Sequence, residues 1–173
     1  MNKAFFIDKD GTLVDNSKYP YEIPSDNLLT SDVIEGLFYL KEKGYKLLII
    51  SNQSWIAKGR MTYNQVTEIF EKLLKKLNIL GIKIDGYYFC PHKSSDNCNC
   101  RKPKTGLVMQ AVKEHSLNLQ ESFFVGDMED DILTGKNSKI KTILVKTGCG
   151  KDYFSKISPD YTIKNINEIR KIV

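Results

Sequence analysis

The sequence predicts an α/β fold in which helices cover both faces of a doubly wound parallel sheet. Two observations favour it. Short uninterrupted apolar runs, typical of strands buried on both faces, alternate with longer segments that have the apolar period of a helix. Polar residues capable of chemistry follow four of these runs, where ligands collect in such sheets. The length of 173 residues predicts a single domain over 1–173, since one domain takes about 150 residues.

Each element has a local signal. A strand is predicted at 3–7, and the stretch 11–29, which has two prolines and no clear period, is predicted to be a loop or short hairpin. Thr30 or Ser31 can cap a helix at 30–43, which Gly44 follows. Thr62 opens a helix at 62–79 and Gly81 closes it. The other predicted strands cover 46–50, 86–90, 122–126 and 141–145, the other helices cover 105–117 and 129–137, and an irregular loop covers 90–104.

Composition and charge limit the kind of protein. The content of 41% hydrophobic and 27% charged residues is that of a globular chain. The longest apolar runs have four residues, far short of the roughly 20 that cross a bilayer. The N-terminus has no secretion signal, so we expect a cytoplasmic protein without a membrane partner. The net charge of +5 suits an anionic ligand, but the basic residues are scattered, so nucleic acid is not the favoured partner.

Two acidic groups follow predicted strands. Asp8 and Asp10 stand two apart where the chain leaves the first strand, so both carboxylates can face one side and hold a hard cation. A strand-end turn would explain this pair as well, since Asp is common in turns. Asp127 lies at the end of the fourth predicted strand and Asp131 in the first turn of the next helix, where acids also complement the helix dipole. The coincidence of Asp127 with Asp8 and Asp10 favours Mg²⁺.

The loop after the third predicted strand has the composition of a zinc site. Three thiols and one imidazole complete a tetrahedral structural set, which leaves no position open for a catalytic water. Free core cysteines and a zinc-ribbon-like nucleic-acid module are the alternatives. The polar residues 93–97 argue against the first, and the presence of only one short loop argues against the second. Zinc would order the loop over about 90–103 and position the cations that follow it, and the expected ligands are Cys90, His92, Cys98 and Cys100.

Ser51, Asn52 and Gln53 follow the second predicted strand. They are either a turn or helix cap, or a hydroxyl and two amides directed at phosphate oxygens. Trp55 is either a packing anchor or a wall of the substrate entrance, and no role is assigned to Cys149.

With these residues assembled, the chain resembles the haloacid dehalogenase superfamily of aspartate-nucleophile phosphatases, type IIIA, over nearly its whole length. Four motifs appear in the family's order, namely Phe6–Thr12, Ser51, Lys102, and Gly126–Asp127 with Asp131. The resemblance implies a Rossmann-like sheet of the haloacid dehalogenase type, without a large cap domain. It also implies Mg²⁺-dependent hydrolysis of a phosphomonoester through an aspartyl-phosphate.

The resemblance also implies roles for individual residues. Asp8 would attack the phosphorus, and Asp10 would protonate the leaving oxygen and then activate water. Asp8, the Asp10 backbone carbonyl and Asp127 would hold Mg²⁺, with Asp131 as a supporting acid. The residues expected to bind the phosphate or the rest of the substrate are Thr12, Ser51, Asn52, Gln53, Arg101 and Lys102.

Within the superfamily, the stretch 51–62 and the sequence Cys100–Pro103 are similar to the D,D-heptose 1,7-bisphosphate phosphatases. Met128 stands where that family usually has lysine, and Trp55 where it has a small residue. The five residues between His92 and Cys98 match the histidinol-phosphate phosphatases, which share the zinc loop. The favoured substrate is a sugar phosphate, D-glycero-D-manno-heptose 1,7-bisphosphate, which would lose its 7-phosphate. The protein is expected to be a monomer. The alternatives are a histidinol-phosphate phosphatase, a polynucleotide 3′-phosphatase and a non-catalytic phosphate-binding domain.

Overall fold

The computed structural model describes residues 1–16, 29, 31–153 and 158–173. Most of the predicted loop or hairpin over 11–29 lies outside these residues, as does the Thr30 cap. Within the described ranges, no helix has both the length and the apolar character needed to span a membrane.

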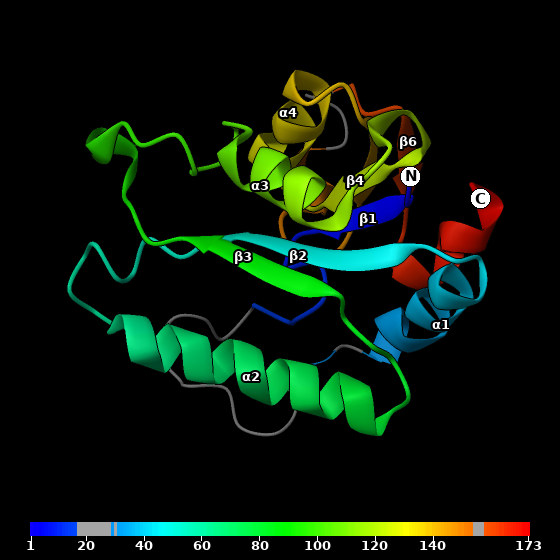
Figure 1. The fold of residues 1–173 in the computed structure, drawn as a ribbon, viewed down its shortest axis with the longest axis horizontal. Coiled ribbons are helices and arrows are strands. Elements are labelled where there is room, and N and C mark those ends of the chain that lie inside the picture. Colours follow the sequence, from blue (N-terminus) through cyan, green and yellow to red (C-terminus); the bar gives the residue numbers. More distant parts are fainter. Residues whose placement is uncertain (17–28, 30, 154–157) are drawn as a thin grey trace.

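The described residues form one sheet of six parallel strands in the order β3-β2-β1-β4-β5-β6. The chain winds outward from β1 in one direction and then from β4 in the other, so β1 and β4 lie side by side at the centre (Figure 1). This is the doubly wound arrangement that the sequence predicts. The strands are β1 (Ala4–Ile7), β2 (Lys46–Asn52), β3 (Gly86–Cys90), β4 (Phe123–Gly126), β5 (Lys141–Val145) and β6 (Tyr161–Ile163).

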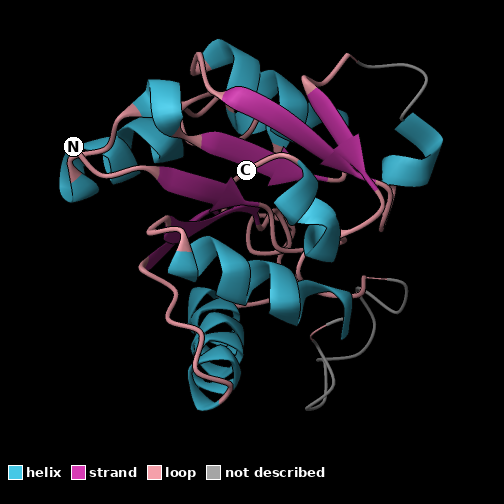
Figure 2. Cartoon of the chain, turned by 90° about the vertical axis from the view of Figure 1, so that its right-hand side faces the viewer, coloured by secondary structure: helices cyan, strands magenta, loops and turns pink. Residues whose placement is uncertain are grey.

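Helices lie on both sides of the sheet (Figure 2). Successive strand residues point to opposite faces, so Phe5 and Ile7 of β1 join one apolar core while Ala4 and Phe6 join the other. The first core is covered by α1, α2 and η4, and the second by α3. The helices are α1 (Ile34–Glu42), α2 (Tyr63–Ile79), α3 (Gly106–His115), α4 (Glu129–Asn137) and α5 (Gly150–Tyr153), with shorter turns η1 (Ser31–Val33), η2 (Ser94–Asp96), η3 (Leu119–Glu121) and η4 (Ile166–Lys171).

Three predicted helix ends, at Gly44, Thr62 and Gly81, have the expected geometry. The predicted cap of the first helix does not, because α1 follows the turn η1 and has Val33 as its N-cap, without a side-chain hydrogen bond. Thr62 Oγ1 accepts a hydrogen bond from Gln65 N at 3.1 Å, and Gln65 Oε1 accepts one from Thr62 N at 2.8 Å, which is a capping box. Gly44 and Gly81 have φ of +77° and +81° just after α1 and α2, a conformation that favours glycine. The five predicted strands and four predicted helices are confirmed, while β6 and α5 were not predicted.

Candidate active site

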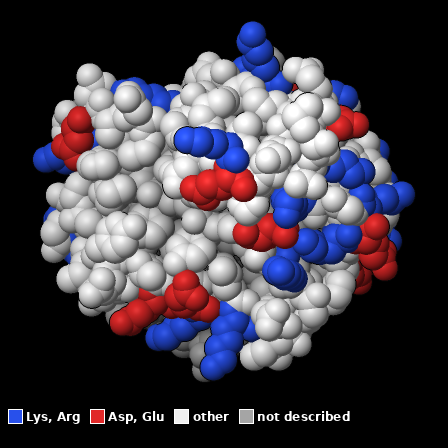
Figure 3. Space-filling model, in the orientation of Figure 1, with Lys and Arg blue, Asp and Glu red and all other residues white. Residues whose placement is uncertain are grey.

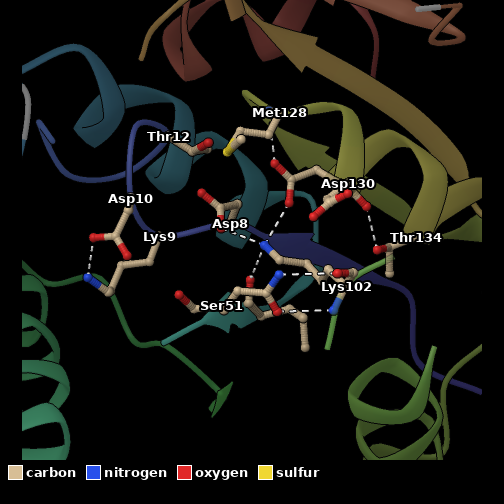
Figure 4. Close-up of polar contacts among 12 residues, drawn as sticks. Asp8, Lys9, Asp10, Thr12, Ser51, Lys102, Met128, Asp130 and Thr134 are labelled. Carbon is tan, nitrogen blue, oxygen red and sulfur yellow. Dashed lines mark hydrogen bonds and ion pairs between the residues drawn. The ribbon is translucent and has the colours of Figure 1, made fainter. Parts of the chain in front are cut away.

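The ammonium group of Lys102 is the centre of a buried cluster at the carboxyl edge of the sheet (Figure 4). Lys102 Nζ lies 2.6 Å from Asp8 Oδ1, which follows β1, and 2.6 Å from Asp131 Oδ1, in the first turn of α4. It also donates to the carbonyl oxygen of Ile50 in β2, at 2.9 Å. The Lys102 side chain is only 4% exposed, and these three acceptors match the three donors of an ammonium. Strand ends that are far apart in the sequence therefore meet at one edge of the sheet, as the sequence predicts, and the Lys102 cation joins them there.

Three buried carboxylates share this site. Oxygen atoms of Asp8, Asp127 and Asp131 lie within 4.8 Å of one another. Burial raises the pKa of Asp8 well above its usual value against the pull of Lys102, and Asp131 and Asp127 raise it further. Burial and the neighbouring charge of Asp131 raise the pKa of Asp127 to about 7. In the described part of the chain, Lys102 is the one cation bonded to this trio, so a divalent cation with oxygen ligands, such as Mg²⁺, fits the donor set.

A loop that the sequence analysis missed holds Asp127. The backbone N of Cys149, after β5, donates to Asp127 Oδ2 at 2.8 Å, and Thr147 Oγ1 donates to the Gly11 carbonyl at 2.6 Å. Gly148 has φ of +51°, and a Cβ there would lie 2.2 Å from Asp127 Oδ2. Only glycine therefore lets this loop approach the carboxylate. Cys149 acts through its backbone, so its residue type carried no signal.

The Asp10 carboxylate is held from two sides. Gln53 Nε2 donates to Asp10 Oδ2 at 2.8 Å and to Ser51 Oγ at 2.8 Å. The ammonium of Lys9 pairs with Asp10 Oδ1, and Figure 4 shows this pair apart from the bonds around Lys102. Lys9 was not among the predicted site residues, although a lysine two residues after a buried strand was a visible signal.

The other residues predicted to bind the substrate lie around this cluster, but in this structure several of them contact protein groups. Asn52 Oδ1 accepts from Lys102 N at 3.0 Å and Asn52 Nδ2 donates to Lys102 O at 3.2 Å, so its amide holds the Lys102 backbone. Arg101 Nη1 donates to the His92 carbonyl at 3.2 Å. Thr12 is buried and its Oγ1 lies 3.5 Å from Asp127 Oδ1, a long contact.

The predicted zinc ligands form a compact tetrad in the loop after β3. Cys90 Sγ lies 3.5 Å from His92 Nδ1, 3.6 Å from Cys98 Sγ and 3.1 Å from Cys100 Sγ. Cys100 Sγ lies 3.4 Å from Cys98 Sγ and 3.2 Å from His92 Nδ1. A tetrahedron with Zn–S bonds of about 2.3 Å has edges of about 3.8 Å, so the tetrad needs only a slight expansion to hold zinc. None of the four cysteines of the chain forms a disulfide.

Proteins that are similar to this chain are phosphatases, in agreement with the geometry of the candidate site. Residues 3–158 match the family model described as polynucleotide kinase 3 phosphatase. The D-glycero-β-D-manno-heptose-1,7-bisphosphate 7-phosphatase of Pasteurella multocida is 38% identical over 180 aligned residues, which cover 100% of this chain and 97% of that protein. The protein of the same name from Helicobacter pylori strain J99 is 44% identical over 150 residues, with 84% of each chain covered.

A solved structure shows the same fold. The crystal structure of D,D-heptose 1,7-bisphosphate phosphatase from B. bronchiseptica, complexed with magnesium and phosphate, superposes with a TM-score of 0.87 at 21% identity. The match covers 98% of this chain and 96% of that one. The predicted resemblance is thereby confirmed: the chain belongs to the polynucleotide kinase 3 phosphatase family and, within the haloacid dehalogenase superfamily, to the group of the heptose-1,7-bisphosphate phosphatases.

Proposed function

We propose that this phosphatase hydrolyses the 7-phosphate of D-glycero-D-manno-heptose 1,7-bisphosphate through an aspartyl-phosphate on Asp8. The observation that carries the chemistry is the Lys102 ammonium shared by Asp8 and Asp131, beside the buried carboxylate of Asp127. The choice of substrate is supported by relatives of that name that match this chain over most or all of its length.

In the first step an oxygen of Asp8 attacks the phosphorus, and the bond from phosphorus to the sugar oxygen breaks. Asp10 gives its proton to that oxygen, which leaves as an alcohol. Lys102 and Ser51 bind the phosphoryl oxygens, where negative charge concentrates in the transition state. Lys102 contacts Asp8, so a phosphoryl group bound at this carboxylate would lie beside the ammonium and share its donors.

In the second step Asp10, now a carboxylate, takes a proton from a water whose oxygen attacks the phosphorus. The bond between phosphorus and Asp8 breaks, inorganic phosphate leaves and Asp8 is regenerated. Asp131 keeps Lys102 in place throughout and caps α4, since its Oδ2 accepts from Met128 N at 3.0 Å.

Two metals fit the residues present. Asp8, Asp127 and the backbone carbonyl of Asp10 would hold Mg²⁺, which when bound offsets negative charge between nucleophile and phosphate. Zinc on the cysteine and histidine tetrad would have no open position and would order the loop that carries Arg101 and Lys102. A single domain over 1–173, a monomer and a cytoplasmic location also remain predictions.

A second candidate substrate is a 3′-phosphorylated polynucleotide, because the matching family model is described by that chemistry. The charge distribution does not favour it. On the face in Figure 3, Lys and Arg lie beside Asp and Glu instead of forming a continuous basic stripe.

The test is phosphate release from a panel of esters, with and without Mg²⁺. The panel contains both anomers of the heptose bisphosphate, histidinol phosphate and a 3′-phosphorylated oligonucleotide. We expect Mg²⁺-dependent turnover with preference for the heptose bisphosphate, and none from Asp8→Asn. Preference for histidinol phosphate or the oligonucleotide would overturn the choice of substrate, and full turnover by Asp8→Asn would overturn the mechanism.

A further inference from the structure

Asp10 is the proposed acid and base, and both of its carboxylate oxygens are engaged by protein groups. Lys9 pairs with Oδ1, and Gln53 Nε2 donates to Oδ2 at 2.8 Å. Two contacts on opposite oxygens fix the plane of a carboxylate as well as its position. An ionised carboxylate has about four lone-pair sites, so each oxygen keeps one for a proton or for the substrate.

Lys9 is placed by its surroundings. Its residue is 2% exposed, and its Nζ lies 5.5 Å from the centre of the Phe70 ring. Burying an ammonium costs free energy unless it is paired, so the contact with Asp10 offsets that cost. The Lys9 carbonyl accepts from Leu13 N and Val14 N, each at 3.0 Å, which fixes the turn that carries both side chains.

Gln53 is fixed at both ends. Its backbone N donates to the carbonyl oxygen of Cys90 at 2.7 Å, and its side chain also reaches Ser51 Oγ at 2.8 Å. It is 2% exposed. Its amide therefore cannot turn toward solvent without breaking these contacts, and it links Asp10 to the end of β3.

We propose that Lys9 and Gln53 are positioning residues for Asp10, holding its carboxylate where it protonates the leaving oxygen of poor leaving groups. When the phosphorus–oxygen bond breaks and Asp10 gives up its proton, a carboxylate forms. The Lys9 ammonium and the Gln53 amide stabilise that new charge without moving, as preorganised groups do. The proposal rests on the proposed role of Asp10.

The test compares leaving groups. A sugar alkoxide needs protonation as it leaves, whereas 4-nitrophenolate is stable as an anion and needs little. The measured quantity is kcat/KM, because hydrolysis of the aspartyl-phosphate comes after the first irreversible step and does not enter it. We expect Lys9→Met and Gln53→Met to lower kcat/KM for the sugar phosphate at least about tenfold more than for 4-nitrophenyl phosphate, since general acids contribute about 10²–10⁴-fold.

Two further variants sharpen the comparison. Lys9→Arg keeps the cation and should retain most of the wild-type ratio between the two substrates. Lys3→Met is the matched control, since Lys3 directly precedes β1 and its Nζ lies 4.1 Å from the Tyr45 ring centre. It should leave kcat/KM for both substrates unchanged. Circular dichroism checks that each variant is folded, and Gln53→Met tests the same carboxylate if Lys9→Met does not fold.

Equal losses on both substrates, or no loss on either, would overturn the positioning role. The outcome is separable from the choice of substrate, because any sugar phosphate that the wild type hydrolyses can be used. Failure on the heptose bisphosphate would overturn the proposed function alone.

Discussion

Replacing Asp127 with asparagine should stabilise the metal-free protein at neutral and alkaline pH. Its carboxylate is fully buried beside Asp8 and Asp131, and its pKa is raised from 3.8 to about 7, by burial first and by Asp131 second. The folded state therefore keeps a proton that the unfolded state has lost. The contribution of Asp127 to the free energy of unfolding is fully present below pH 3.8 and is lost as pH rises to about 7.

The magnitude follows from the two pKa values. The difference between 3.8 and about 7 corresponds to about 4 kcal/mol, of which about 3 kcal/mol falls between pH 5 and pH 8. Asparagine carries no charge at any of these pH values, and its carbonyl oxygen can still accept the hydrogen bond from Cys149 N. The free energy of unfolding of the variant should therefore fall less between pH 5 and pH 8 than that of the wild type. It should still fall somewhat, because the pKa of Asp8 is also raised.

The assay is urea unfolding across this pH range, with and without Mg²⁺. Mg²⁺ should stabilise the wild type most at the alkaline end, because it binds the ionised carboxylates of the folded state, and should stabilise Asp127→Asn little. Equal pH slopes and equal Mg²⁺ responses in the two proteins would refute the assignment of Asp127.

Three other changes test separate parts of the structure. Cys98→Ser should lower bound zinc from about one per chain to none by elemental analysis, and a variant that keeps its zinc would contradict the tetrad. Lys102→Met should lower the free energy of unfolding in urea by about 3–5 kcal/mol, because it leaves buried carboxylates without their cation. It should also reduce phosphate release at least about 100-fold. A variant as stable as the wild type would contradict the ion pairs. Asp85 accepts from Leu47 N at 2.8 Å and pairs with Lys41 Nζ at 2.9 Å. Burial would raise its pKa, but these partners lower it, so the loss of about 1–3 kcal/mol in Asp85→Asn should shrink as pH falls below about 4. Activity per folded molecule should stay unchanged, and a loss that does not depend on pH would contradict the ion pair.

The sheet could be predicted because its central strands are buried on both faces. A run such as Ala4–Ile7 has no polar residue, and the polar residues that follow such runs mark the carboxyl edge. β6 lacked this signal, because Tyr161–Ile163 is three residues long and only Ile163 is buried. Its first residue follows Asp160, whose side chain bonds Thr142 N and Oγ1 of β5, and a tertiary contact of this kind has no local pattern.

The residue types and strand positions predicted where the candidate site residues lie, but not how their side chains are oriented. Lys102 meets Asp8 and Asp131 because strand topology brings them to one edge. Nothing in the sequence states that the Asn52 amide would face the Lys102 backbone, because an amide at a strand end can turn either way. Backbone donors such as Cys149 N are independent of side-chain identity and were invisible for that reason.

The proposed mechanism depends most on Asp8 as the nucleophile, and trapping the phosphoenzyme tests this role directly. Asp10→Asn should still react with 4-nitrophenyl phosphate, because its leaving group needs little protonation. The variant should hydrolyse the resulting aspartyl-phosphate slowly, because the base that activates water is missing. After acid quench in Mg²⁺, mass spectrometry of the peptide that contains Asp8 should show one added phosphoryl group, absent from Asp8→Asn. A phosphoryl group on another residue, or turnover by Asp8→Asn, would contradict the account.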